Sequence, residues 1–211
     1  MIIAIDGPAA AGKGTLAKRL AAHFGLAVLD TGLLYRAVGL KTVRRGADAN
    51  DADAATAVAR ELGAGDLEDA DLRGDEAANA ASVVAAIPEV RAAVLEFQRA
   101  FARNPPGNAQ GAVLDGRDIG TVVCPQADVK FFVTAPVEVR AGRRLKELRE
   151  RGLEAIHSRV LQDMKARDAR DAGRDVAPLV PAEDAFVLDT SEMDAGRVFA
   201  AALAIIKSRT R

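Results

Sequence analysis

Residues 7–15, GPAAAGKGT, are the stretch that decides which fold this sequence predicts. Their spacing, G-x-x-x-x-G-K, is typical of a loop that wraps phosphate groups with its backbone N–H groups. Such a motif is informative only between a strand and a helix. Here it follows the apolar run 2–5 and precedes a stripe of Leu16, Leu20 and Phe24 at helical spacing. Unlike the common pattern, Gly14 separates Lys13 from the hydroxyl of Thr15.

Outward from this loop, short apolar runs alternate with helical patterns. The further runs are 27–29, 112–114, 129–133 and 186–188, and their lack of polar alternation suits strands buried on both faces. Helices are predicted at 13–24, 33–45 and 88–103, the last beginning with Pro88. The alternation predicts an α/β fold with a doubly wound five-stranded parallel sheet, whose ligands collect at the carboxyl ends of the strands.

The whole chain of 211 residues is predicted to form one domain, because 49% apolar residues are ample for a core. Two regions interrupt the alternation. Residues 48–86 are acidic and alanine-rich and look like a helical insertion, whereas 140–174 are dense in arginine and aspartate and are expected to form a mobile lid.

Bulk properties exclude several classes of protein. A net charge of −1 argues against nucleic-acid binding, and no apolar stretch is long enough to span a membrane. The single Cys124 fits a reducing compartment, and the N-terminal MIIAIDG lacks a basic leader. We therefore expect a cytoplasmic monomer whose partners are small molecules.

The phosphate loop suggests specific chemistry. Lys13 would place its charge near the β- and γ-phosphates of ATP, and Thr15 would reach Mg²⁺ directly or through water. Asp115 ends an apolar run, so it either holds water on the same metal ion or merely caps its strand. A second phosphate ester would need arginines opposite the loop, because the guanidinium group binds phosphate in a bidentate manner. Candidates are Arg36, Arg117, Arg167 and Arg174.

Five segments together resemble the successive signatures of bacterial cytidylate kinases, which are nucleoside monophosphate kinases with a phosphate loop. They are GPAAAGKGTLAKRLA, LDTGLLYRAVG, NAASVVAAIPEVR, LDGRDIGTVV and RDARDAGRDVAPL, in family order over most of the chain. The GKGT variant of the loop is similar to that of nucleoside monophosphate kinases.

The resemblance implies a role for each matching residue. ATP would bind to Gly7, Pro8, Ala9, Ala10, Ala11, Gly12, Lys13, Gly14 and Thr15. The acceptor phosphate would be held by Arg36, Arg117 and Arg174, the cytosine by Ser82, Arg91 and Asp118, and the ribose by Arg167 and Asp171. Lys13, Arg117, Arg174 and a lid arginine, Arg140 or Arg144, would act on the transferring group.

The implied reaction is transfer of the γ-phosphoryl group of ATP to CMP or dCMP, with Mg²⁺ as cofactor. Alternatives are a kinase for UMP, AMP or shikimate, or an ATP-hydrolysing switch protein. A GTPase switch is disfavoured because the N-K-x-D motif is absent. From the residues alone, Arg91 fits the solvent face of its helix, and Arg117 and Asp118 fit a salt bridge within a turn.

One region departs from the family pattern. Bacterial cytidylate kinases commonly carry a small antiparallel sheet in the acceptor-binding insertion. Residues 61–78, ELGAGDLEDADLRGDEAA, contain almost no β-branched or aromatic residues. We therefore predict that this sheet is missing or reduced.

Overall fold

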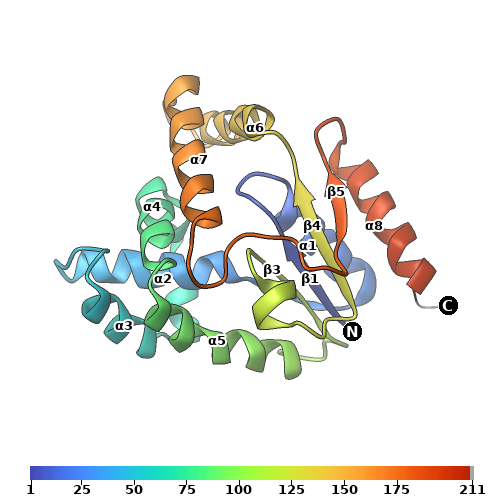
Figure 1. The fold of residues 1–211 in the computed structure, drawn as a ribbon, viewed down its shortest axis with the longest axis horizontal. Coiled ribbons are helices and arrows are strands. Elements are labelled where there is room, and N and C mark those ends of the chain that lie inside the picture. Colours follow the sequence, from blue (N-terminus) through green and yellow to red (C-terminus); the bar gives the residue numbers. More distant parts are fainter. Residues whose placement is uncertain (210–211) are drawn as a thin grey trace.

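The computed structural model describes residues 1–209, and its centre is a five-stranded sheet (Figure 1). The strands are β1 (Ile2–Asp6), β2 (Ala27–Asp30), β3 (Ala112–Gly116), β4 (Val129–Thr134) and β5 (Phe186–Asp189). Their order is β2-β3-β1-β4-β5, and all four pairings are parallel. The predicted five-stranded parallel α/β fold is confirmed, and the five predicted runs each lie inside a strand.

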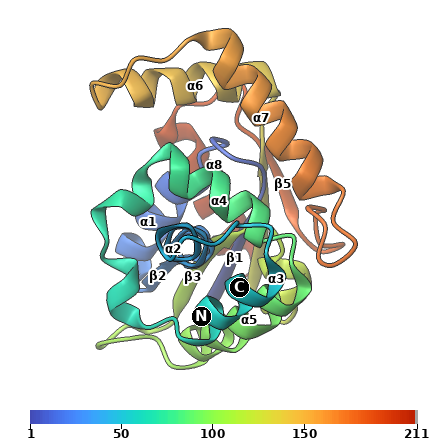
Figure 2. The ribbon, with the colours of Figure 1, turned by 90° about the vertical axis from the view of Figure 1, so that its left-hand side faces the viewer.

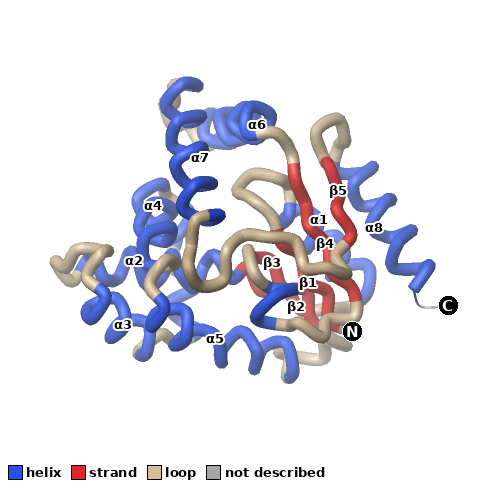
Figure 3. The backbone as a smooth tube through the Cα atoms, in the orientation of Figure 1, coloured by secondary structure: helices blue, strands red, loops and turns tan. Residues whose placement is uncertain are grey.

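Helices cover both faces of the sheet, as Figure 3 shows. On one face, Ile3 and Ile5 of β1 pack with α1 (Lys13–Phe24) and α8 (Ala195–Arg209). On the other, Ala4 packs in a cluster that includes Ala102 of α5 (Pro88–Arg103). Because successive residues of a strand point to opposite faces, the apolar run of β1 fills both cores.

The helix after β2 begins earlier than predicted. The structure has α2 at Thr31–Arg44 rather than 33–45, because the Asp30 carboxylate accepts a hydrogen bond from the Gly32 N–H and caps the helix at Asp30. This early start places Thr31 and Gly32 at the carboxyl end of the sheet, beside the phosphate loop.

The elements within residues 48–86 are helical: α3 (Ala52–Arg60), two 3₁₀ turns η1 (Ala64–Leu67) and η2 (Ala70–Arg73), and α4 (Asp75–Val84). No strand occurs within residues 61–78, all of which the structure describes. The segment 140–174 lies mostly in α6 (Val137–Glu150) and α7 (His157–Ala172). Figure 2 shows α6 and α7 above α4 and α2, at the same end of the molecule as the phosphate loop.

No helix within residues 1–209 combines the length and the apolar character that crossing a membrane requires.

Candidate active site

A cavity of about 510 Å³ opens at the carboxyl end of the sheet. Its wall is formed by the phosphate loop, the start of α2, the helices α4, α6 and α7, and the segment after β3. Among the predicted site residues, those on the wall are Ala9, Ala10, Gly12, Lys13, Gly14, Thr15, Arg36, Ser82, Arg91, Asp115, Arg117, Asp118, Arg144, Arg167, Asp171 and Arg174. Residues separated by more than 150 positions in the chain therefore meet in one space.

The phosphate loop needs its glycines for conformational reasons. Gly7 has φ +143°, and a Cβ atom there would lie 2.0 Å from the carbonyl oxygen of Val133. Gly12 has φ +99° and precedes the first residue of α1, so the helix N-terminus points into the loop. The Lys13 ammonium donates to the Pro8 carbonyl at 3.0 Å, which keeps it across the loop.

Asp115 approaches this loop from β3. Its carboxylate lies 3.9 Å from the Lys13 ammonium, and both side chains are buried. Burial lowers the pKa of Lys13 and raises that of Asp115. A Cβ atom on Gly14 would lie 3.3 Å from Asp115 Oδ2, so the glycine after the lysine leaves room for the carboxylate. The Thr15 hydroxyl and the Asp115 carboxylate both line the cavity. Their oxygens suit Mg²⁺, which takes oxygen ligands and usually completes its coordination shell with water and phosphate.

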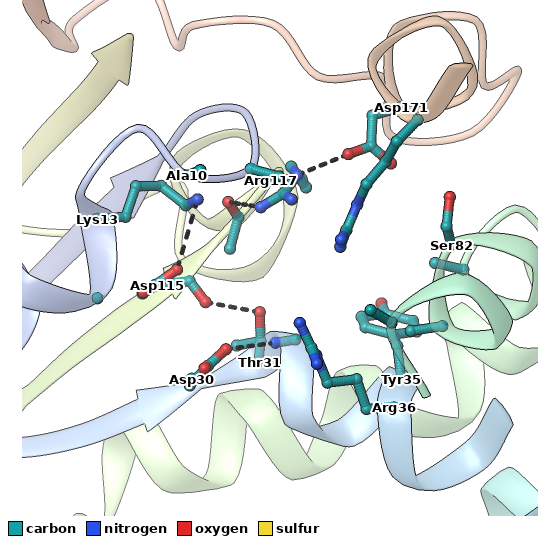
Figure 4. A pocket seen from close by; sticks show the side chains of 18 of the residues that line it. Ala10, Lys13, Asp30, Thr31, Tyr35, Arg36, Ser82, Asp115, Arg117 and Asp171 are labelled. Atoms are coloured by element: carbon teal, nitrogen blue, oxygen red, sulfur yellow. Dashed lines mark hydrogen bonds and ion pairs between the residues drawn. The ribbon is translucent and has the colours of Figure 1, made fainter. Parts of the chain in front are cut away.

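Four arginines, Arg36, Arg117, Arg167 and Arg174, lie on the cavity wall, and two of them share one ion-pair partner. Arg117 Nε donates to Asp171 at 2.8 Å, and Arg174 pairs with the other oxygen of the same carboxylate. Arg36 donates to the Leu72 carbonyl, and Arg167 forms no ion pair within residues 1–209. Figure 4 shows Lys13, Arg36 and Arg117 reaching into one space from three separate elements.

This arrangement is electrostatically incomplete without an anion. Burial, followed by the neighbouring Arg117, lowers the pKa of Arg167 to about 10. The Nε atoms of Arg167 and Arg174 are buried and have no hydrogen-bond partner among residues 1–209. A buried polar group without a partner is costly, so an anionic ligand with several oxygens would stabilise this cluster.

Arg91 and Asp118, both on the cavity wall, form a buried ion pair. Arg91 lies over the Tyr35 ring, 5.5 Å from its centroid, and also donates to the Ala85 carbonyl. The alternative that Arg91 faces solvent is therefore wrong, since only 7% of the residue is exposed. The turn salt bridge between Arg117 and Asp118 is also wrong, because these neighbours pair with Asp171 and Arg91 respectively.

Helices α6 and α7 each contact α4 through a side chain. Arg170 Nε on α7 donates to Ser82 Oγ at 2.9 Å, and Arg144 on α6 pairs with Asp75. Of the two lid arginines predicted, Arg144 lies on the cavity wall. Arg140 is buried instead, donating to the Ala135 and Ala9 carbonyls and pairing with Asp168.

Several wall residues were not predicted from the sequence, among them Asp30, Tyr35, Asp75 and Asn79. Asp30 had a local signal, since an aspartate before a predicted helix is a typical N-cap. Tyr35 stood directly before Arg36 in LDTGLLYR. Asp75 and Asn79 lie in the alanine-rich insertion, where nothing in the pattern distinguishes them from surface residues.

Asp6, the last residue of β1, adjoins this site without reaching the cavity wall. Burial raises its pKa to about 6, and the Asp118 carboxylate acts in the same direction. The N–H groups of Ile119 and Gly120 and the Lys13 ammonium oppose this change. The pKa in the folded chain thus exceeds the ordinary value of 3.8, so this group favours folding below pH 4 and loses that contribution as pH rises through 6.

We accordingly expect the free energy of unfolding of the wild type to fall relative to Asp6→Asn between pH 4 and pH 7. The relative change is roughly 3 kcal/mol, from about 2 pKa units. Urea unfolding of both proteins at the two pH values measures it, and a constant difference would contradict the assignment.

Comparison with known proteins agrees with this geometry. A family model described as cytidylate kinase matches residues 3–208. A cytidylate kinase of Paramagnetospirillum magneticum is 67% identical over 208 residues, covering 99% of this chain and 98% of that protein. A cytidylate kinase of Rhodospirillum rubrum is 61% identical over 211 residues, covering 100% and 99%.

Two solved structures share the fold at low sequence identity. An uncharacterised protein from Eubacterium ventriosum has a TM-score of 0.57 at 15% identity and covers 99% of both chains. A sugar kinase from Janibacter sp. has a TM-score of 0.50 at 16% identity, covering 98% of this chain and 94% of its own. Because the family model and the close relatives span nearly its whole length, this chain belongs to the cytidylate kinase family.

Proposed function

We propose that this protein is a phosphotransferase that moves the γ-phosphoryl group of ATP to CMP or dCMP, giving ADP and CDP or dCDP. The observation that carries the proposal is the cluster of Arg36, Arg117, Arg167 and Arg174 facing the phosphate loop across one cavity. Two of its buried Nε atoms, those of Arg167 and Arg174, lack partners within residues 1–209, so the cluster offers donors to the phosphate and the ribose of an acceptor nucleotide.

The donor side is formed by residues 7–15. Backbone N–H groups of the loop and the N-terminus of α1 would face the phosphates of ATP, with the Lys13 charge between the β- and γ-phosphates. Thr15 and Asp115 would hold Mg²⁺, directly or through water. When bound, this ion neutralises negative charge on the phosphates.

The acceptor base would lie against the Arg91–Asp118 pair. The carboxylate oxygen of Asp118 that is not paired with Arg91 suits the N4 amino group of cytosine, while Arg91 and Ser82 suit its acceptors N3 and O2. Uracil would present its O4 to the buried carboxylate of Asp118, and these two oxygen acceptors would face each other without a hydrogen between them. That mismatch disfavours UMP by a few kcal/mol.

Catalysis then depends on alignment and charge. A phosphate oxygen of CMP attacks the γ-phosphorus, a new P–O bond forms, and the bond to the bridging oxygen of ADP breaks. The attacking oxygen is already anionic, so no general base is required. Lys13, Arg117 and Arg174 hold the two repelling phosphates in line and stabilise the charge spread over the transferring group. Arg167 and Asp171 would face the ribose.

Arg144 is the lid residue proposed to contact the transferring group, because it lies on the cavity wall whereas Arg140 is buried in contacts of its own. We expect Arg144→Ala to lower kcat by about 10- to 100-fold. Asp75→Ala removes only its exposed partner, and such surface pairs contribute little, so kcat should stay within about threefold. Steady-state kinetics of the two variants show whether Arg144 acts on the transferring group or only through its ion pair with Asp75. Equal losses would mean that Arg144 acts only by linking α6 to α4.

The function is tested by ADP release from purified protein with Mg-ATP and, in parallel, CMP, dCMP, UMP, AMP, shikimate or no acceptor. We expect fast release with CMP and dCMP only. Release without acceptor would support an ATP-hydrolysing switch protein, and turnover with another acceptor would mean that Asp118 and Arg91 read a different ligand. Sedimentation of the same sample tests the expected monomer.

A further inference from the structure

The carboxylate of Asp6 holds the segment that follows Asp118. Asp6 ends β1 and is 4% exposed. Its Oδ1 accepts a hydrogen bond from the Ile119 N–H at 2.8 Å, and its Oδ2 accepts one from the Gly120 N–H at 2.7 Å. These are the two residues directly after Asp118, so both oxygens of one buried side chain are committed to the backbone of this segment.

The segment is a single π-helical turn, η3 (Ile119–Val123), and Asp118 is the residue that caps it. The first N–H groups of a helical turn need acceptors from outside, and an aspartate at the cap position often supplies one from its own side chain. Here the Asp118 side chain makes no such bond, because it pairs with Arg91 instead. Asp6 takes over the capping, which leaves the Asp118 carboxylate free to face the cavity.

Packing around the turn leaves little room for adjustment. A Cβ atom on Gly116 would lie 2.6 Å from Ile119 Cδ1 and 2.7 Å from Thr31 Oγ1. A Cβ atom on Gly120 would lie 3.1 Å from Lys130 Cδ and 3.3 Å from Asp6 Oδ2. Close packing of this kind transmits small shifts, so the backbone position of Asp118 depends on where Asp6 holds Ile119 and Gly120.

We propose that Asp6 is a positioning residue for base selection: by capping η3 from β1, it fixes the Asp118 carboxylate at the place where the acceptor base is recognised. Asp6 touches neither nucleotide and acts through the main chain. The inference rests on the proposed function, in which Asp118 distinguishes cytosine from uracil.

The test is the ratio of kcat/KM for CMP to kcat/KM for UMP in Asp6→Asn. The amide oxygen accepts one of the two N–H bonds, while its NH₂ group faces the other N–H. We expect this ratio to fall about fivefold and the KM for ATP to stay within about twofold. A purely structural role would reduce the active fraction, which cancels in the ratio. An unchanged ratio in folded Asp6→Asn would overturn the proposal.

Asp128→Asn is the matched control. The Asp128 carboxylate also accepts a backbone N–H from β1, that of Ile2 at 2.7 Å, but at the end of the strand remote from the cavity. Its ratio should equal that of the wild type, and a fivefold fall there as well would count against a specific role for Asp6. If Asp6→Asn does not fold by circular dichroism, Asp6→Glu gives the same test, since it keeps the charge and moves the oxygens by one methylene.

A double-mutant cycle separates action through Asp118 from an independent effect. In the Asp118→Asn background, adding Asp6→Asn should leave the CMP-to-UMP ratio unchanged, because the carboxylate that Asp6 positions is gone. The same fivefold fall in both backgrounds would overturn the proposal. Wild-type protein without CMP turnover would instead refute the proposed function, which the same assay reveals separately.

Discussion

Replacing Lys13 by alanine is expected to lower CMP-dependent ADP release by about a thousandfold or more, with the fold preserved. The ammonium group lies across the phosphate loop, bonded to the Pro8 carbonyl, and is 6% exposed. Few charges on the donor side could replace it, because the loop otherwise offers backbone N–H groups with partial charges. Its removal also leaves the buried Asp115 without its nearest cation.

The measurement is a coupled ADP assay with Mg-ATP and CMP, accompanied by circular dichroism to establish that the variant is folded. Lys165→Ala is a suitable control, since this lysine of α7 is largely exposed and, within residues 1–209, its one ion pair is with Glu138 on the surface. Its rate should stay within about twofold of the wild type. Wild-type turnover in folded Lys13→Ala would refute the assignment of residues 7–15 as the ATP site.

The strands and the phosphate loop were predictable because their signals are local. The apolar run IIAI at residues 2–5 predicts a strand that is buried on both faces of a sheet. The motif GPAAAGKGT predicts a phosphate loop because it lies between this strand and a helix. The start of α2 was predicted two residues late because apolar periodicity begins only at Leu33. The capping carboxylate of Asp30 sets the helix start instead.

The contacts that organise the site were beyond the reach of local patterns. Asp6 and Ile119 are 113 positions apart, and Ser82 and Arg170 are 88 apart. The residue types at these positions do not predict that the two members of each pair form a hydrogen bond. Arg91 illustrates the limit, since helical periodicity alone placed it on the solvent face. The structure instead buries Arg91 in an ion pair with Asp118. The family resemblance implied only that both residues would bind the same cytosine, and not that they would contact each other.

That ion pair makes Asp118 the residue whose replacement should most change the choice of acceptor. Asp118→Asn is nearly isosteric, but it turns one carboxylate oxygen into an NH₂ group. An oxygen left beside Arg91 then places the NH₂ where cytosine presents N4 and where uracil presents the acceptor O4. We expect the ratio of kcat/KM for CMP to that for UMP to fall by about a hundredfold.

The route by which the ratio changes is itself informative. Loss should come mainly from kcat/KM for CMP, with UMP turnover constant or increased, because uracil gains a donor at O4. Arg91→Met removes the cationic partner of the same ion pair and leaves the buried Asp118 carboxylate without its cation. We expect this change to reduce the free energy of unfolding by about 3–5 kcal/mol. Asp118→Asn keeps an oxygen acceptor beside Arg91 and nearly the same side-chain volume, so it is the milder test of recognition. If its CMP-to-UMP ratio equals that of the wild type, the base is recognised elsewhere in the cavity, and the Arg91–Asp118 pair serves packing alone.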